Sequence, residues 1–219
     1  MDRRWRRWVV AGLIAVSLAG CGQKDINTVE PSSARLAAYQ SPDLLVLRPM
    51  NPPVTVPAAA FTAQSGALET PQMFRDHWTL FYVGYSFCPD ICPTELTALA
   101  ELLPKLKKAL PSVHWQVVFL SVDPDRDHPK RLAEYAHYFD PSFIGMTGSR
   151  ASIDAVTGAL KAGYRIAPHA PGSVSYEIDH DTGYRLISPQ GKMVALLPSP
   201  HDPAAMTKAL VQFFDEVVQ

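Results

Sequence analysis

The sequence predicts an α/β fold in which helices flank a mixed sheet, with a β-hairpin and a helix at the C-terminus. Continuous apolar runs typical of buried strands alternate with segments of helical leucine spacing, and a turn signal joins two late apolar segments. With 219 residues, 47% of them hydrophobic, the chain can bury a sizeable core. Its formal net charge of -1 leaves no basic surplus for phosphates, so no nucleic-acid partner is expected.

The individual elements follow from these patterns in chain order. Apolar runs predict two buried strands, helical spacing predicts the segments between them, and Pro104 should kink or end the first helix. Pro189-Gln190-Gly191 joins the strands of the hairpin, and Asp202 should cap the last helix. The predicted strands are 78–85, 115–122, 144–147, 164–167, 184–188 and 193–197, and the predicted helices are 93–110, 129–139, 153–163 and 204–218.

The N-terminus has the pattern of an export signal. A basic start with Arg3, Arg4, Arg6 and Arg7 precedes an apolar run over 8–19, which is shorter than the ~20 residues that a membrane-spanning helix needs. The run ends in Leu18-Ala19-Gly20-Cys21, which matches the lipobox of bacterial lipoproteins. We therefore expect a signal peptide over 1–20, a lipid anchor on Cys21, and a location on the periplasmic side of a membrane in the cell envelope.

A proline-rich stretch follows the expected lipidation site. Residues 21–53 contain many prolines and one short apolar patch at 44–47, which predicts a lipid-anchored tether. Residues 54–219 then form one folded domain, because they suffice for a single core and are too few for two.

The two remaining cysteines lie where thiol chemistry is favoured. Cys88 and Cys92 follow the first buried strand and open a helix, where amide dipoles favour the thiolate. A stabilising disulfide or two inert core cysteines is the alternative, but so small a loop adds only roughly 2 kcal/mol in the chain-entropy model. The pair is therefore interpreted as functional.

The Cys-x-x-x-Cys spacing leaves two kinds of chemistry open. The sulfurs lie close enough to form a redox-active disulfide, as in a dithiol exchanger, or to chelate one soft ion. Two thiolates favour Cu(I) or zinc, and such an ion needs a further ligand, for which imidazole is suited. His180 precedes the predicted hairpin, although a histidine between Asp179 and Asp181 is more often a solvated loop residue. The other histidines are set aside as surface or structural residues: His77, His114, His128, His137, His169 and His201.

Four segments, in order, resemble the signature of the Sco/SenC family, copper proteins that assist assembly of the CuA centre of cytochrome c oxidase. The segments are 84–96, 119–127, 143–148 and 176–180. The resemblance implies a thioredoxin-like fold and one copper, Cu(I) or Cu(II), held by Cys88, Cys92 and His180. It also implies a copper donor chaperone and the CuA-bearing oxidase subunit as partners.

Two main hypotheses follow for this domain. The first is a membrane-tethered copper chaperone, with reduction of the acceptor's cysteines by the same dithiol as an optional second activity. The second is a thiol-disulfide oxidoreductase of the cell envelope without a copper role, which needs only Cys88 and Cys92; a peroxiredoxin-like peroxidase is a weaker third. The turn Asp123-Pro124-Asp125-Arg126-Asp127 is interpreted as structural, with a partner-docking rim as its alternative.

Overall fold

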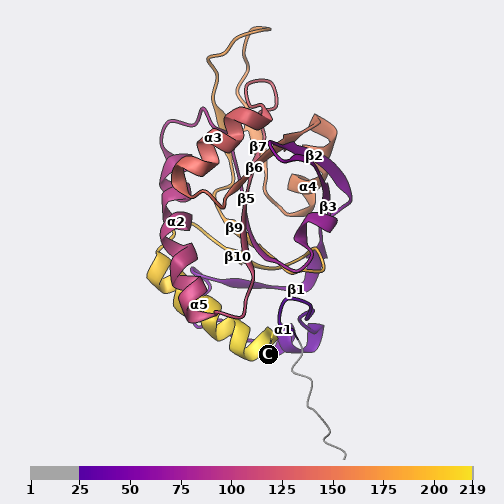
Figure 1. Cartoon of the computed structure of the whole chain (residues 1–219), viewed down its shortest axis with the longest axis vertical. Coiled ribbons are helices and arrows are strands. Elements are labelled where there is room, and N and C mark those ends of the chain that lie inside the picture. Colours follow the sequence, from indigo (N-terminus) through magenta and orange to yellow (C-terminus); the bar gives the residue numbers. More distant parts are fainter. Residues whose placement is uncertain (1–24, 219) are drawn as a thin grey trace, which may run out of the picture.

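The computed structural model describes residues 25–218, which fold around one large mixed sheet (Figure 1). Eight strands form the sheet in the order β1-β10-β9-β4-β5-β6-β2-β3, and β7 pairs with β8 in a separate ribbon. The strands are β1 (Arg48–Thr55), β2 (Ala59–Ala63), β3 (Gly66–Thr70), β4 (Trp78–Gly84), β5 (Trp115–Ser121), β6 (Ile144–Gly148), β7 (Tyr164–Ile166), β8 (Ile178–His180), β9 (Tyr184–Ile187) and β10 (Lys192–Leu197). The helices are α1 (Ser33–Ala38), η1 (Gln72–Phe74), α2 (Ile91–Ala109), α3 (Pro129–Phe139), α4 (Arg150–Ala159), α5 (Pro203–Phe213) and the π-helical turn η2 (Phe214–Val218). The expected mixed sheet with flanking helices is confirmed.

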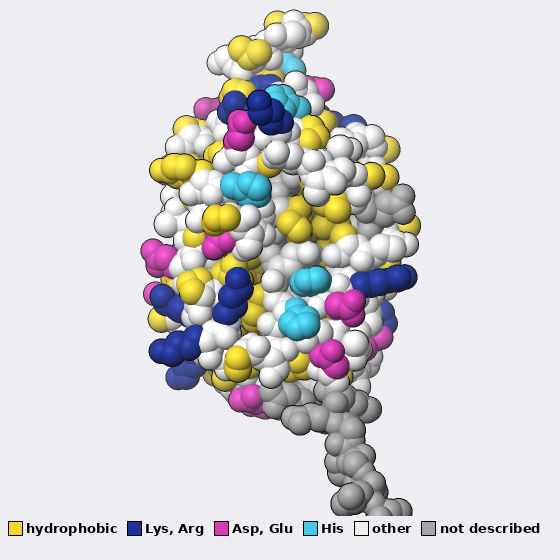
Figure 2. All heavy atoms as spheres, in the orientation of Figure 1, with side chains coloured by type: hydrophobic (Ala, Val, Ile, Leu, Met, Phe, Trp, Pro, Cys, Tyr) yellow, Lys and Arg dark blue, Asp and Glu magenta, His cyan; other side chains and the backbone are white. Residues whose placement is uncertain are grey.

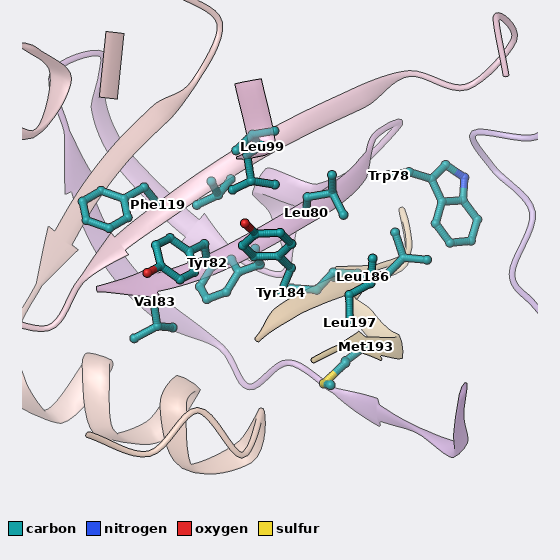
Figure 3. Close-up of a cluster of buried hydrophobic side chains, with 14 of the residues drawn as sticks. Trp78, Leu80, Tyr82, Val83, Leu99, Phe119, Tyr184, Leu186, Met193 and Leu197 are labelled. Atoms are coloured by element: carbon teal, nitrogen blue, oxygen red, sulfur yellow. The ribbon is translucent and has the colours of Figure 1, made fainter. Parts of the chain in front are cut away.

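Strand β4 lies at the centre of the sheet. It runs parallel to β5 and antiparallel to β9, and all of its residues are buried, as its continuous apolar sequence predicts. Figure 3 shows its side chains Trp78, Leu80 and Tyr82 among side chains from the neighbouring strands and from α2. The core therefore forms around the strand that leads into the two cysteines.

Helices α2, α3 and α5 lie on one side of the central strands in Figure 1, and α4 lies on the other. Helix α2 continues through Pro104, so the expected early break does not occur. Its buried side chains Leu99, Leu102, Leu103 and Leu106 lie on both sides of the proline. Burial of this face outweighs the roughly 3 kcal/mol that an interior proline costs a helix.

Several predicted boundaries shift, and one hairpin was not predicted. Helix α4 begins at Arg150 instead of residue 153, because the Ser149 side chain accepts a hydrogen bond from the Ser152 amide and caps it. The missed hairpin, β2 with β3, is rich in alanine, and along β2 only Phe61 and Ala63 are buried. Such a sequence has little of the β-branched and aromatic content that marks strands.

The segment expected to be a tether is folded onto the domain from residue 25. Ile26 accepts a hydrogen bond from the indole of Trp78 at 3.1 Å, and Asn27 bonds to the Ser112 carbonyl at 2.9 Å and the His114 amide at 2.6 Å. Strand β1 pairs with β10 at the sheet edge. Leu36 and Leu47 of this segment are buried in the hydrophobic core, which explains why the stretch does not behave as a free linker.

The expected signal peptide and Cys21 lie outside the described residues. Within 25–218, none of the helices combines the length and apolar character required for a membrane span. On the face seen in Figure 2, basic and acidic side chains are interspersed, in keeping with the near-neutral composition.

A buried polar cluster joins α2 to the C-terminal elements. Glu95 is 4% exposed, and its carboxylate accepts hydrogen bonds from the Tyr184 hydroxyl at 2.6 Å, from Ser199 at 3.3 Å and from His201 Nδ1. The His201 ring also stacks on Tyr184. Burial alone would raise the pKa of Glu95, but the hydrogen bonds from His201 and Tyr184 outweigh it and lower this pKa. His201, set aside from the sequence, is therefore a structural residue of the core.

The Glu95→Gln variant should lose about 1–3 kcal/mol of unfolding free energy at pH 7, because its partners keep a weaker acceptor. A carboxyl with a lowered folded-state pKa stabilises the fold above its unfolded value of 4.5, and this contribution disappears as the pH falls through the lower folded-state pKa. The difference between the wild type and the variant should therefore shrink on acidification in urea titrations. Glu101→Gln, on an exposed position of α2, is the control and should change stability by less than about 0.5 kcal/mol. A constant difference at every pH would contradict this assignment.

Candidate metal centre

The two cysteines lie where β4 ends and α2 begins, as expected from the sequence. Cys88 is in the loop after Gly84, and Cys92 is in the first turn of α2. The Cys92 amide, near the helix N-terminus, points at the Cys88 sulfur at 3.5 Å. Both cysteines are free thiols in the structure. A helix N-terminus and a direct amide contact both favour a thiolate at Cys88.

His180 comes from a distant part of the sequence. It is the last residue of β8, and its Nε2 lies 3.2 Å from the sulfur of Cys92. The ligand atoms of Cys88, Cys92 and His180 all lie within 4.8 Å of one another, and within residues 25–218 no other group of this kind could hold a metal. The structure thus brings together the three residues that the family resemblance implied.

The two thiols differ in exposure and in acidity. Cys88 keeps 8% of its surface exposed, whereas Cys92 has none. A hydrogen bond from the Cys92 thiol lowers the pKa of Cys88 well below that of an ordinary thiol. The same hydrogen bond and the burial of its sulfur raise the pKa of Cys92. In the metal-free protein, Cys88 is therefore the outer thiolate and Cys92 the inner thiol.

The His180 ring is oriented by the backbone and by aromatic edges. Its Nδ1 lies 3.1 Å from the carbonyl oxygen of Asp181, and the rings of Tyr82 and Tyr85 meet it edge-on with centroids about 6 Å away. A proton on Nδ1 satisfies that carbonyl and leaves the Nε2 lone pair directed at the sulfurs, as a metal ligand requires.

The two flanking carboxylates have other partners. Asp179 pairs with Arg165 at 2.6 Å, and Asp181 pairs with the buried Arg185 at 2.7 Å. The ion pairs of these carboxylates are thus with arginines and not with the imidazole, and Asp179 lies in β8 rather than in a loop.

The donor set fits a soft metal ion. Thiolate and imidazole ligands lie about 2.0–2.3 Å from an ion such as zinc, so atoms within 4.8 Å of one another reach a common ion after small adjustments. Two sulfurs and one nitrogen suit Cu(I) and zinc, and the imidazole also suits Cu(II).

Gly84 makes room for the inner sulfur. A Cβ atom at this position would lie 2.7 Å from the Cys92 Sγ and 2.9 Å from Cε2 of Phe119. Phe119 and Cys92 are both fully buried, so neither can move aside without disturbing the core. The close approach of backbone to sulfur thus requires a glycine here.

The Asp123–Asp127 segment is a turn, as predicted, and it is more deeply buried than a solvated loop. The Asp127 amide donates to the Asp123 carbonyl at 2.8 Å, and Arg126 pairs with the Asp123 carboxylate. Asp127 is 1% exposed and accepts hydrogen bonds from the Ser86 amide at 2.9 Å and from Ser121 at 2.5 Å. The turn therefore fixes the segment just before Cys88, a role that local spacing could not reveal.

The Gly84→Ala variant should lose about 1–3 kcal/mol of unfolding free energy, because the added methyl overpacks the contact between Cys92 and Phe119. Its affinity for Cu(I) should fall as well, because the inner sulfur must shift. Urea unfolding and competition with a colorimetric Cu(I) chelator measure the two effects. Gly158→Ala is the control: it lies in α4 with open space around the new Cβ, and it should be neutral or stabilising. Unchanged stability and affinity in Gly84→Ala would show that the contact is not restrictive.

Comparison with known proteins gives a consistent match. The family model described as SCO1/SenC matches residues 52–215. A mitochondrial SCO1 homolog 1 of Arabidopsis thaliana is 34% identical over 147 residues, which are 67% of this chain and 43% of the relative. The human mitochondrial SCO1 homolog is 30% identical over 135 residues, 62% of this chain and 44% of the relative. The chain thus spans less than half the length of these curated relatives.

Solved structures match over most of the described fold. Arabidopsis thaliana ScoI with copper bound has a TM-score of 0.66 and 30% identity, covering 74% of this chain and 98% of that one. Yeast Sco1 with copper bound has a TM-score of 0.69 and 26% identity, covering 76% and 91%. The likeness extends to the mixed sheet and its helices and is consistent with a thioredoxin-like fold. With the family model covering residues 52–215, this chain belongs to the SCO1/SenC family.

Proposed function

We propose that this protein is a copper chaperone that binds one copper ion through Cys88, Cys92 and His180 and delivers it to cytochrome c oxidase during assembly. The observation that carries the proposal is the convergence of two sulfurs and one imidazole nitrogen within 4.8 Å in a chain of this family. Sco structures from Arabidopsis and yeast that match this fold have copper bound, which supports copper as the cargo.

The two kinds of ligand serve different oxidation states. The thiolates of Cys88 and Cys92 are soft ligands that stabilise Cu(I), and the imidazole of His180 supplies a ligand suited to Cu(II) as well. The low pKa of Cys88 means that this ligand is already deprotonated at neutral pH. Only the thiol of Cys92 must lose a proton when the ion binds.

The exposure of the site indicates a direction for transfer. Of the two sulfur ligands, Cys88 is nearer to solvent and Cys92 is fully buried, while the His180 side is partly exposed. A copper donor chaperone would load the ion from the Cys88 side, and thiolates of the CuA-bearing oxidase subunit would displace Cys88 first and Cys92 last. Each exchange replaces one copper–sulfur bond by another, so the ion moves without a change of oxidation state.

The same dithiol can reduce an acceptor disulfide. The Cys88 thiolate attacks one acceptor sulfur, forms a mixed disulfide and releases the other acceptor sulfur as a thiolate. Cys92, after losing its proton to that thiolate, attacks Cys88 and frees the second acceptor thiolate. This step alone would make the protein a thiol-disulfide oxidoreductase. The near contact of His180 with Cys92 favours the metal-binding function, because dithiol exchange needs no imidazole.

His180→Ala separates the two functions. Copper chaperoning predicts a fall in Cu(II) affinity of at least about tenfold and a changed visible absorption spectrum, because the only imidazole donor is lost. Reduction of a small disulfide by the variant should continue, because both thiols remain. Titration with copper under anaerobic conditions measures the first effect, and His137→Ala, at an exposed position of α3, is the control. Unchanged copper binding together with efficient disulfide cycling would favour the oxidoreductase.

We also propose that Cys21 carries a lipid that anchors the chain on the periplasmic side of a membrane. The basic start, the apolar run and the Leu18-Ala19-Gly20-Cys21 sequence support this location. Cys21→Ser should abolish incorporation of labelled fatty acid and shift the protein from the membrane fraction to the soluble fraction. Cys88→Ser should leave both unchanged. Continued labelling of the Cys21→Ser protein would exclude this anchor.

A further inference from the structure

The side chain of Arg126 connects the turn after β5 to the segment that leads into His180. Its Nε bonds to the Asp123 carboxylate at 2.5 Å, and its Nη1 donates to the carbonyls of Val174 at 3.1 Å and Tyr176 at 2.9 Å. The guanidinium lies 3.5 Å from the centroid of the Tyr176 ring. The Arg126 side chain is 5% exposed, so these contacts are largely shielded from water.

Tyr176 closes this arrangement from the other side. Its hydroxyl donates to the second oxygen of Asp123 at 2.6 Å, so one carboxylate holds both the arginine and the tyrosine. Two residues further on, the Ile178 amide donates to the Tyr85 hydroxyl at 3.4 Å. Residues 174–180, which we call the His180 arm, are thereby fastened to the body of the domain. The loop 167–177 between β7 and β8, which includes the start of this arm and is orange in Figure 1, projects from the end of the molecule opposite the C-terminus.

The same guanidinium also reaches the cysteine side of the site. It lies 4.8 Å from the centroid of Phe87 and 5.5 Å from that of Tyr85. Phe87 directly precedes Cys88, and the Tyr85 ring meets His180 edge-on. One buried cation therefore touches the segments that lead into two of the three ligands.

We propose that Arg126 is a positioning residue that holds the His180 arm against the dithiol, so that the metal site is assembled before the ion arrives. The proposal rests on the proposed function, because it concerns the same site. A ligand that is already held in place loses little conformational entropy when the ion binds. An arm released from Arg126 would lose that entropy at each binding event, which would weaken binding. Cu(II), for which the imidazole is the better-suited ligand, should depend on Arg126 more than Cu(I), which two thiolates can hold.

Two variants test the contact between Arg126 and Tyr176, each by changing one of the two residues. Arg126→Gln removes the cation, and Tyr176→Leu removes the ring on which it lies while leaving the pair between Arg126 and Asp123 intact. The second variant matters because Arg126→Gln leaves a buried carboxylate unpaired and can lower global stability. Arg131→Gln is the matched control. Its guanidinium also lies over Phe87, at 4.0 Å, but its hydrogen bond goes to Ser86 instead of the His180 arm.

The first measurement needs no metal. Amide hydrogen exchange of the copper-free, reduced protein should become about tenfold faster in residues 174–181 of Arg126→Gln and Tyr176→Leu, because this arm then opens locally. Exchange in β4 and β5 should stay slow in Tyr176→Leu, and Arg131→Gln should match the wild type throughout. Wild-type exchange rates in the arm of both test variants would overturn the proposal.

The second measurement uses copper. In Arg126→Gln and Tyr176→Leu, Cu(II) affinity should fall about tenfold with an altered absorption and electron paramagnetic resonance spectrum, while Cu(I) affinity changes by less than about threefold. Arg126→Lys should restore little, because a lysine cannot stack on Tyr176 and bond to both carbonyls at once. A loosened arm with unchanged Cu(II) affinity and spectrum would overturn the positioning role. If the wild type bound no copper, the proposed function would fail, and hydrogen exchange alone would still decide whether Arg126 holds the arm.

Discussion

The antiparallel pairing of β4 with β9 is the constraint on which the site depends. β4 ends at Gly84 and delivers the chain to Cys88, while β9 begins at Tyr184, a few residues after His180. Because the two strands run in opposite directions, with Phe81 opposite Arg185, the end of one meets the beginning of the other. Residues far apart in sequence are thus brought to one edge of the sheet. The continuous burial of β4 makes this pairing rigid, because a shift in register would disturb the whole core.

Most of the fold could be predicted from local sequence patterns. The remainder depended on tertiary contacts, which local patterns do not reveal. Buried strands and the hairpin showed as apolar runs, and α3 begins at the expected Pro129. The proline-rich segment before residue 54 resembled a linker, because its few apolar residues are not spaced with the periodicity of a helix or a strand. Leu36 and Leu47 nevertheless find buried places against the domain. Tertiary burial, which single-sequence reasoning cannot see, overrides composition there.

The site was predictable only where a local sequence feature marked it. The two cysteines could be identified because they lie between a predicted strand and a predicted helix, which is a local feature of the sequence. His180 had no local signal and was identified through the family resemblance. The turn that contains Arg126 was interpreted as structural. Arg126 does pair locally with Asp123, but its stacking on Tyr176 joins segments fifty residues apart in sequence. Such contacts depend on how two loops pack against each other in the folded protein, so the sequence of either loop alone does not predict them.

Residues 26 and 27 are attached beside the amino ends of β4 and β5, at the opposite end of β4 from the cysteines. From that end to the cysteines the chain runs along the seven residues of β4, which span about 23 Å. Under the lipid anchoring proposed for Cys21, only four peptide steps separate the lipid from Asp25, a reach of at most about 14 Å. The domain would then stand close to the bilayer with its dithiol directed away from it, and the sheet would act as a rigid spacer. An acceptor on the same membrane would then have to present its cysteines at a matching distance from the bilayer, so an anchored domain would select partners by height as well as by chemistry.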